Sequence, residues 1–95
     1  MATVSWSTGA IGDLQRLYRF LAKTNLVAAS RSIATIRKSV ERLERFPQGG
    51  RPARKEDARI RDWIIPFGKS GYIARYLYEG ETVVILLVRH QRELL

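Results

Sequence analysis

The sequence contains no cysteine, and this absence limits both its chemistry and its expected surroundings. Without thiols the chain forms neither a disulfide framework nor a thiolate metal site. Its apolar runs fall short of the roughly 18–20 residues that a membrane-spanning helix requires, and its first residues lack the basic start and apolar middle of a signal peptide. We therefore expect a cytoplasmic protein with no membrane partner, no metal and no cofactor.

Acidic residues are also scarce. The chain has nine Asp and Glu against seventeen Lys and Arg, which gives a net charge of +8 and a pI near 10.6. Most of the cations are arginine, whose planar guanidinium group pairs bidentately with carboxylates and phosphates. This excess predicts a partner that is either an acidic protein or a nucleic acid.

The length of 95 residues allows one domain, which we place at residues 1–95. Its apolar fraction of 45% is ordinary for a globular chain. A domain of this size buries only a limited core, so a partner that covers apolar surface would add to its stability.

The strongest local pattern lies between Gly71 and Arg92. Two apolar-rich runs, Tyr72–Tyr78 and Val83–Val88, flank the pair Glu79-Gly80. β-Branched and aromatic residues on both sides of a short turn are typical of a β-hairpin. The second run contains no polar residue, which indicates a strand that is buried in the middle of a sheet.

The segment that precedes this hairpin is amphipathic. A short strand over Thr3–Trp6 is followed by a helix that Ser7 or Thr8 caps. The apolar residues of this helix recur at three- and four-residue steps, at Ala10, Ile11, Leu14, Leu17, Tyr18 and Leu21. Asn25 is the expected cap of a second amphipathic helix over Leu26–Phe46.

Proline and glycine divide the segment between the second helix and the hairpin. We expect Pro47 to end the helix and Gln48–Pro52 to form a turn. Alternating residues predict a strand over Ile60–Ile65 that Pro66 ends, and residues 67–71 are expected to be a flexible connection.

The predicted order is therefore β-α-α-β-β-β, which defines an α+β fold with a two-helix hairpin packed on a mostly antiparallel sheet. Such a hairpin covers one face of the sheet, yet Val83–Val88 is apolar on both faces. We therefore expect the other face to stay partly exposed or to be covered by another chain.

Short sequence pieces occur in a fixed order along nearly the whole chain. They are Trp6-Ser7 with Asp13-Leu14, Phe46-Pro47 with Gly50-Arg51-Pro52, Ile65-Pro66-Phe67 after Arg61, Gly71–Tyr76, and Val84–Glu93. On these pieces the chain resembles the ParE/RelE superfamily of bacterial toxins, the toxic halves of type II toxin–antitoxin pairs, and in particular its ParE-like members. The resemblance implies two helices on an antiparallel sheet, in agreement with the predicted order.

Two activities compete within this superfamily. ParE-like members inhibit DNA gyrase and block replication, whereas RelE-like members cut messenger RNA on the ribosome. The resemblance implies growth arrest, a role in plasmid stabilisation, and a cognate antitoxin that is ParD-like, with a ribbon-helix-helix domain and an acidic tail. Our leading hypothesis is a gyrase inhibitor that acts by binding, and the alternative is a ribosome-dependent endoribonuclease.

The candidate residues differ between the two hypotheses. Cutting RNA needs an acid, a base and cations, for which the sequence offers His90, Arg75 and Arg92. It offers no evident second acid beside the histidine and no dense lysine set, which favours the gyrase inhibitor. The expected contacts with antitoxin or target are Arg31, Arg42, Arg61, Trp63, Arg75, Arg89 and Arg92.

Overall fold

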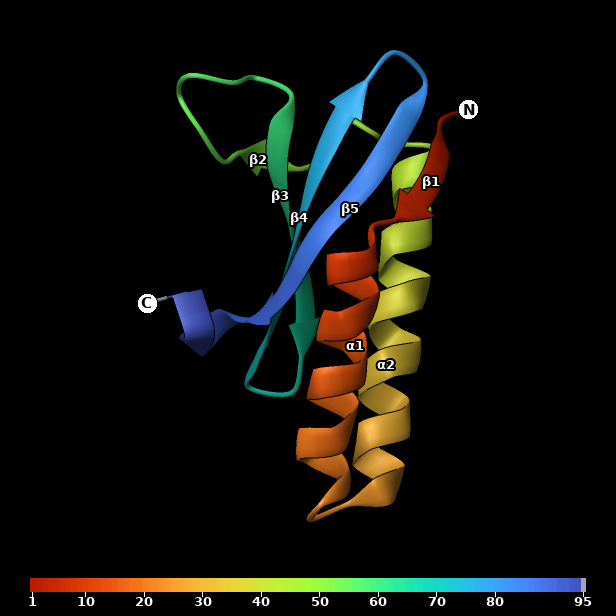
Figure 1. The fold of residues 1–95 in the computed structure, drawn as a ribbon, viewed down its shortest axis with the longest axis vertical. Helices are drawn as coiled ribbons and strands as arrows, with labels where there is room; N and C mark the ends of the chain where they lie inside the picture. Colours follow the sequence, from red (N-terminus) through yellow and green to blue (C-terminus); the bar gives the residue numbers. More distant parts are fainter. Residues whose placement is uncertain (95) are drawn as a thin grey trace.

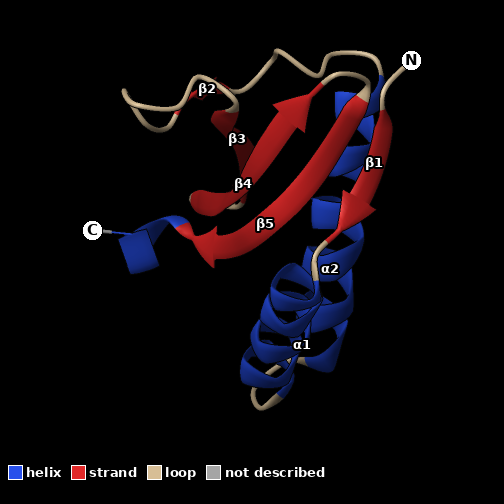
Figure 2. Cartoon of the chain, turned by 45° about the horizontal axis from the view of Figure 1, so that its top comes forward, coloured by secondary structure: helices blue, strands red, loops and turns tan. Residues whose placement is uncertain are grey.

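The computed structural model describes residues 1–94 as two layers, a five-stranded sheet with a pair of helices on one of its faces (Figures 1 and 2). This architecture confirms the predicted α+β class. The elements in chain order are β1 (Thr3–Trp6), α1 (Thr8–Ala22), α2 (Leu26–Glu41), the 3-10 turn η1 (Arg42–Glu44), β2 (Arg51–Pro52), β3 (Ile60–Phe67), β4 (Ser70–Glu79), β5 (Thr82–His90) and the 3-10 turn η2 (Gln91–Leu94).

The strands lie in the order β1-β5-β4-β3-β2, so the last strand of the chain is central. β1 is parallel to β5 and the other neighbours are antiparallel, as predicted for a mostly antiparallel sheet. The ladder between β4 and β5 contains one β-bulge. Tyr76 lies opposite Ile85 and Arg75 lies opposite Leu87, which leaves Leu86 without a partner on β4.

Both helices begin at the predicted caps. The Ser7 hydroxyl accepts a hydrogen bond from the Ala10 amide, and the Asn25 side chain accepts one from the Ala28 amide, each at 3.0 Å. These bonds satisfy amides that the first helical turn leaves free. The helices then run antiparallel to each other and extend past one end of the sheet (Figure 1).

The core lies between the helices and the sheet. α1 contributes Ala10, Leu14 and Leu17, and α2 contributes Ile36 and Val40. The inward side chains of the sheet are Ile65, Tyr72, Ala74, Tyr76, Val83, Ile85 and Val88. Tyr76 is fully buried, and its hydroxyl donates to the Pro47 carbonyl at 2.7 Å and accepts from the Gly50 amide at 2.9 Å. One tyrosine thus joins β4 to the segment that leads into β2.

The second helix is shorter than predicted. α2 ends at Glu41, and the chain tightens into η1 before it reaches Pro47. The carbonyl of Glu44 accepts a hydrogen bond from the Ala2 amide at 2.9 Å, which holds η1 against the start of β1. As a result Phe46 is 59% exposed and does not share the buried face of α2.

Three predictions about the proline-containing segments were also wrong. β3 continues through Pro66, which lies opposite Gly71, and residues 68–69 form a tight turn with Gly68 at φ 60° in place of a flexible connection. β2 pairs only with Arg61 and Asp62, so β3 is an edge strand at Pro66, where the ladder tolerates a missing amide. Arg51–Pro52, predicted as part of a turn, forms β2.

The face of the sheet away from the helices is apolar in part. On β5, Val83, Ile85 and Val88 are buried in the core, whereas Val84, Leu86 and Leu87 point to the open face and are half-buried. This arrangement confirms that the strand is apolar on both faces. The open face therefore offers apolar surface that the chain itself leaves in contact with solvent.

Candidate binding groove

A groove opens where the helices pass the end of the sheet. Its volume is about 730 Å³, within the range of ligand-binding pockets. Its floor and one wall are largely apolar, and its other wall is formed by the ends of β4 and β5 and by η2. The lining residues are Arg16, Leu17, Phe20, Leu21, Ala28, Ser32, Phe67, Ser70, Tyr72, His90, Arg92 and Glu93.

His90 lies in this groove with both ring nitrogens engaged. Its Nδ1 accepts a hydrogen bond from the Arg92 amide at 3.2 Å, and its Nε2 lies 3.0 Å from the Ser70 hydroxyl. A backbone amide only donates, so Nδ1 is the acceptor in its contact with Arg92. The ring also packs edge-on against Tyr72, with centroids 5.4 Å apart. The histidine is therefore held in place by neighbours on both sides of its ring.

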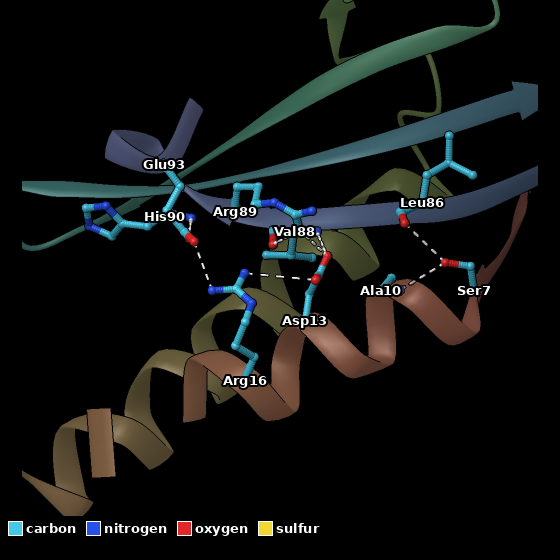
Figure 3. A network of polar contacts seen from close by, with 9 residues as sticks. All are labelled: Ser7, Ala10, Asp13, Arg16, Leu86, Val88, Arg89, His90 and Glu93. Carbon is cyan, nitrogen blue, oxygen red and sulfur yellow. Dashed lines mark hydrogen bonds and ion pairs between the residues drawn. The ribbon is translucent and has the colours of Figure 1, made fainter. Parts of the chain in front are cut away.

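A chain of polar contacts holds this end of β5 against α1 (Figure 3). The Asp13 carboxylate accepts from the Val88 amide at 2.9 Å and from the Arg89 guanidinium. Arg16 donates to Glu93 at 2.8 Å, and Glu93 accepts from the His90 amide at 2.7 Å. Beyond the last residue of β1, α1 thereby contacts the edge of β5, and Glu93 of η2 is bonded to both α1 and β5.

Asp13 lies beyond the first turn of α1 and reaches the sheet, where it satisfies an amide of β5. Such an amide would otherwise be free on an edge strand.

The three residues proposed for RNA cleavage do not come together. His90 and Arg92 line the groove, but Arg75 points to the open face of the sheet, where it binds Asp62 through two hydrogen bonds of 2.8 and 3.1 Å. These bonds raise the pKa of Arg75 above its usual value, despite the opposing effect of burial. Arg75 is thus held in an ion pair with Asp62 and lies on the wrong side of the sheet to assist His90.

Several other predicted contact residues stabilise the fold from within. Arg61 donates to the carbonyls of Gln48 and Gly50 at 3.2 and 2.8 Å. The Trp63 indole donates to the carbonyl and the hydroxyl of Ser39, and the guanidinium of Arg42 lies 6.0 Å from its ring centroid.

Arg89 is bound by Asp13, whereas Arg31 and Arg92 are exposed. In the described chain neither Arg31 nor Arg92 forms an ion pair. Of the predicted contact residues, Arg92 is therefore the cation that the groove presents.

Most of the groove was not predicted. Ser70 fell in a segment expected to be flexible. Tyr72 is buried in the core, and its hydroxyl lies 3.1 Å from that of Ser32. Arg16 and Phe20 flank the predicted apolar stripe of the first helix. Phe20 is 69% exposed, and a large apolar residue beside such a stripe was the available signal.

The groove suits binding more than acid–base chemistry. Apolar side chains form its base, while Arg16, Arg92 and His90 lie at one end. The Nη1 atom of Arg16 donates to Glu93 and its buried Nη2 atom lies 3.9 Å from the Asp13 carboxylate, so two internal carboxylates hold this guanidinium group. The described residues contain no cluster of His, Cys, Asp and Glu that could hold a metal ion. Across the same residues, every helix is too short or too polar to cross a membrane.

Comparison with known proteins identifies the chain. The profile of the ParE toxin of the type II toxin–antitoxin system ParDE matches residues 4–95. Toxin RelE3 of Caulobacter vibrioides is 31% identical over 93 residues, which is 98% of each chain. A structure described as the chromosomal ParDE TA system from P. aeruginosa superimposes with a TM-score of 0.77 at 22% identity, and the match covers 95% of this chain and 96% of that one. Two helices on a mostly antiparallel five-stranded sheet make this an α+β protein with the same fold as that structure. The chain belongs to the ParE toxin family of type II toxin–antitoxin systems.

Proposed function

We propose that this toxin inhibits DNA gyrase by binding it and that a ParD-like antitoxin neutralises it in the cytoplasm. The observation that carries the proposal is the separation of the candidate catalytic groups by the sheet. Cleavage of RNA needs an acid, a base and cations held together at one site. His90 and Arg92 line the groove, whereas Arg75 is bonded to Asp62 on the other face of the sheet.

The antitoxin, in this proposal, covers the groove and the open face of the sheet. A helix with an apolar stripe fits against Leu17, Phe20 and Phe67, and carboxylates beside that stripe reach Arg92, which is exposed and forms no ion pair among residues 1–94. Complementary charge favours fast and specific association with a chain of net charge +8. The acidic tail expected of such an antitoxin supplies these carboxylates.

A supercoiling assay with purified gyrase tests the main proposal. We expect the toxin to inhibit supercoiling of relaxed plasmid and the antitoxin to restore it. His90→Ala is expected to inhibit as strongly as the unaltered chain, because binding needs no proton transfer. Absence of inhibition at any toxin concentration would refute the proposal.

The second candidate function is a ribosome-dependent endoribonuclease. The specific observation in its favour is that His90 and Arg92 share one groove with Ser70, and a relative of 31% identity is named as a RelE toxin. Primer extension on translated messages tests it. If His90 is catalytic, His90→Ala should cleave RNA roughly 10²–10⁴-fold more slowly than the unaltered chain. An absence of cut sites with the unaltered chain would exclude this activity.

A further inference from the structure

The helical hairpin has a second lined surface, on the flank opposite the groove. A shallow cleft of about 410 Å³ runs between α1 and α2, lined by Leu14, Gln15, Tyr18, Arg19, Ile33 and Arg37. We call the exposed part of this surface, with Ile11, the outer flank. Neither the proposed antitoxin site nor the core uses its exposed residues.

The helix period places this flank away from the groove. Successive residues turn about 100° around an α-helix, so Gln15, Tyr18 and Arg19 point to the side of α1 opposite Arg16 and Phe20, which line the groove. The two surfaces therefore share no lining residue.

The outer flank is apolar at its centre. Ile11 is 45% exposed and Tyr18 is 36% exposed, although both belong to the apolar stripe predicted for the first helix. Ile33 of α2 is partly buried and lines the cleft together with Tyr18. Leu26, about two helical turns before Ile33 on the same side of α2, is 62% exposed. Exposed apolar residues that cluster on one surface mark contact with another protein.

The charge of the hairpin has one sign. No Asp or Glu occurs between Leu14 and Val40, and the segment carries Arg16, Arg19, Lys23, Arg31, Arg37 and Lys38. All but Arg16 lack an ion-pair partner within residues 1–94. An array of cations without internal carboxylates complements an acidic surface.

These features distinguish between possible occupants. A second copy of the chain would bring another surface of net positive charge, which like-charge repulsion disfavours. A nucleic acid backbone would use Arg19 and Arg37 but would leave Ile11, Tyr18 and Leu26 without an apolar partner. A protein helix with one apolar face and one acidic face contacts both the exposed apolar residues and the cations of this surface.

We propose that the outer flank docks an acidic amphipathic helix on the surface of the toxin's protein target. The helix lies in the cleft between α1 and α2, with its apolar side on Tyr18 and Ile33 and its carboxylates at Arg19 and Arg37. This inference rests on the proposed function, because it takes the target to be a protein. It adds that the target is recognised through the helical hairpin and that the groove is left free.

The test compares two charge-reversed variants in binding to purified gyrase and in the supercoiling assay. Arg19→Glu/Arg37→Glu alters the outer flank, and Arg54→Glu/Lys55→Glu makes the same change of charge on the exposed loop before β3. We expect the first variant to lose roughly 10–100-fold in affinity for gyrase and the second to lose much less. Both are expected to bind the antitoxin, which shows that they are folded.

The outcomes separate this inference from the proposed function. Absence of inhibition by the unaltered chain refutes the gyrase proposal itself. Inhibition that survives in Arg19→Glu/Arg37→Glu, or that falls equally in both variants, overturns the outer flank as the docking surface. A loss of ribosome or RNA binding, with gyrase binding retained, assigns the flank to nucleic acid and also overturns the inference. Should the first variant fail to fold, Arg19→Gln/Arg37→Gln with Tyr18→Ala replaces it under the same criteria.

Discussion

The two ends of the sheet use the same kinds of residue in opposite ways. At the end next to β2, Arg61, Asp62, Trp63, Arg75 and Tyr76 are bonded to one another or to the backbone. At the end next to η2, Arg16, His90, Arg92 and Glu93 form exposed contacts around a groove. We refer to these as the β2 end and the groove end.

The difference shows that an arginine-rich sequence does not by itself reveal where a partner binds. A guanidinium group that is bonded to a carboxylate or to carbonyls of its own chain is oriented by them, and another molecule must compete with these partners for it. Only its internal partners, which the fold supplies, decide whether it is available. The comparison predicts that substitutions at the β2 end alter stability, whereas those at the groove end alter binding.

The largest expected effect is that of Tyr76→Phe. Loss of the hydroxyl leaves the Gly50 amide and the Pro47 carbonyl without their partner, and each unsatisfied buried group costs about 1–3 kcal/mol. We expect the free energy of unfolding in urea to fall by about 2–4 kcal/mol.

Tyr78→Phe is the matched control, because within residues 1–94 the hydroxyl of Tyr78 makes no hydrogen bond. It should change the free energy of unfolding much less. Equal effects of the two substitutions would show that the β2 end does not depend on the bonds of Tyr76.

A smaller effect is expected from alkaline pH. Burial raises the pKa of Tyr76 above its ordinary value of 10.0, and this outweighs the lowering by the Gly50 amide and Arg61. Because the folded pKa is higher, the contribution to stability is complete below pH 10 and is lost as the pH rises through the folded value. Urea unfolding from pH 8 to 11 should show this loss, and Tyr76→Phe should reduce it. An unchanged slope in Tyr76→Phe would contradict the assignment.

The smallest effect is expected at the groove end. Glu93→Gln weakens the ion pair with Arg16, whose side chains are 36% and 42% exposed, and exposed pairs contribute less than about 1 kcal/mol. The free energy of unfolding should therefore change little, while the salt dependence of antitoxin binding should change because Arg16 is released. A loss as large as that of Tyr76→Phe would show that the two ends do not differ.

Much of the fold could be predicted because its signals are local. The caps Ser7 and Asn25, the helical stripe and the turn at Gly80 act within a few residues. β2 could not be predicted, since a two-residue strand has no pattern and exists only through its pairing with β3. β3 likewise continues through Pro66 because β2 does not extend beside that residue, and the sequence does not show where β2 pairs.

The bulge in β5 explains why the candidate site was only partly predicted. Simple alternation from the buried Ile85 would point His90 to the open face, beside Arg75. The additional residue at Leu86 shifts the register, so that Val88 is buried and His90 points to the groove. A shift of one residue moves every later side chain to the other face, and no local feature of the sequence shows that it occurs.

The separation of the groove from the outer flank has a thermodynamic consequence for competition between antitoxin and target. Two ligands change each other's affinity only through a coupling free energy, and here the outer flank and the groove have no lining residue in common. If both sites are occupied as proposed, the antitoxin and the target do not compete for a shared patch. They exclude each other through steric overlap outside the two sites or through a conformational change in the helices. A short antitoxin tail alone would then leave the affinity for the target unchanged, and neutralisation would require the larger body to which that tail is attached.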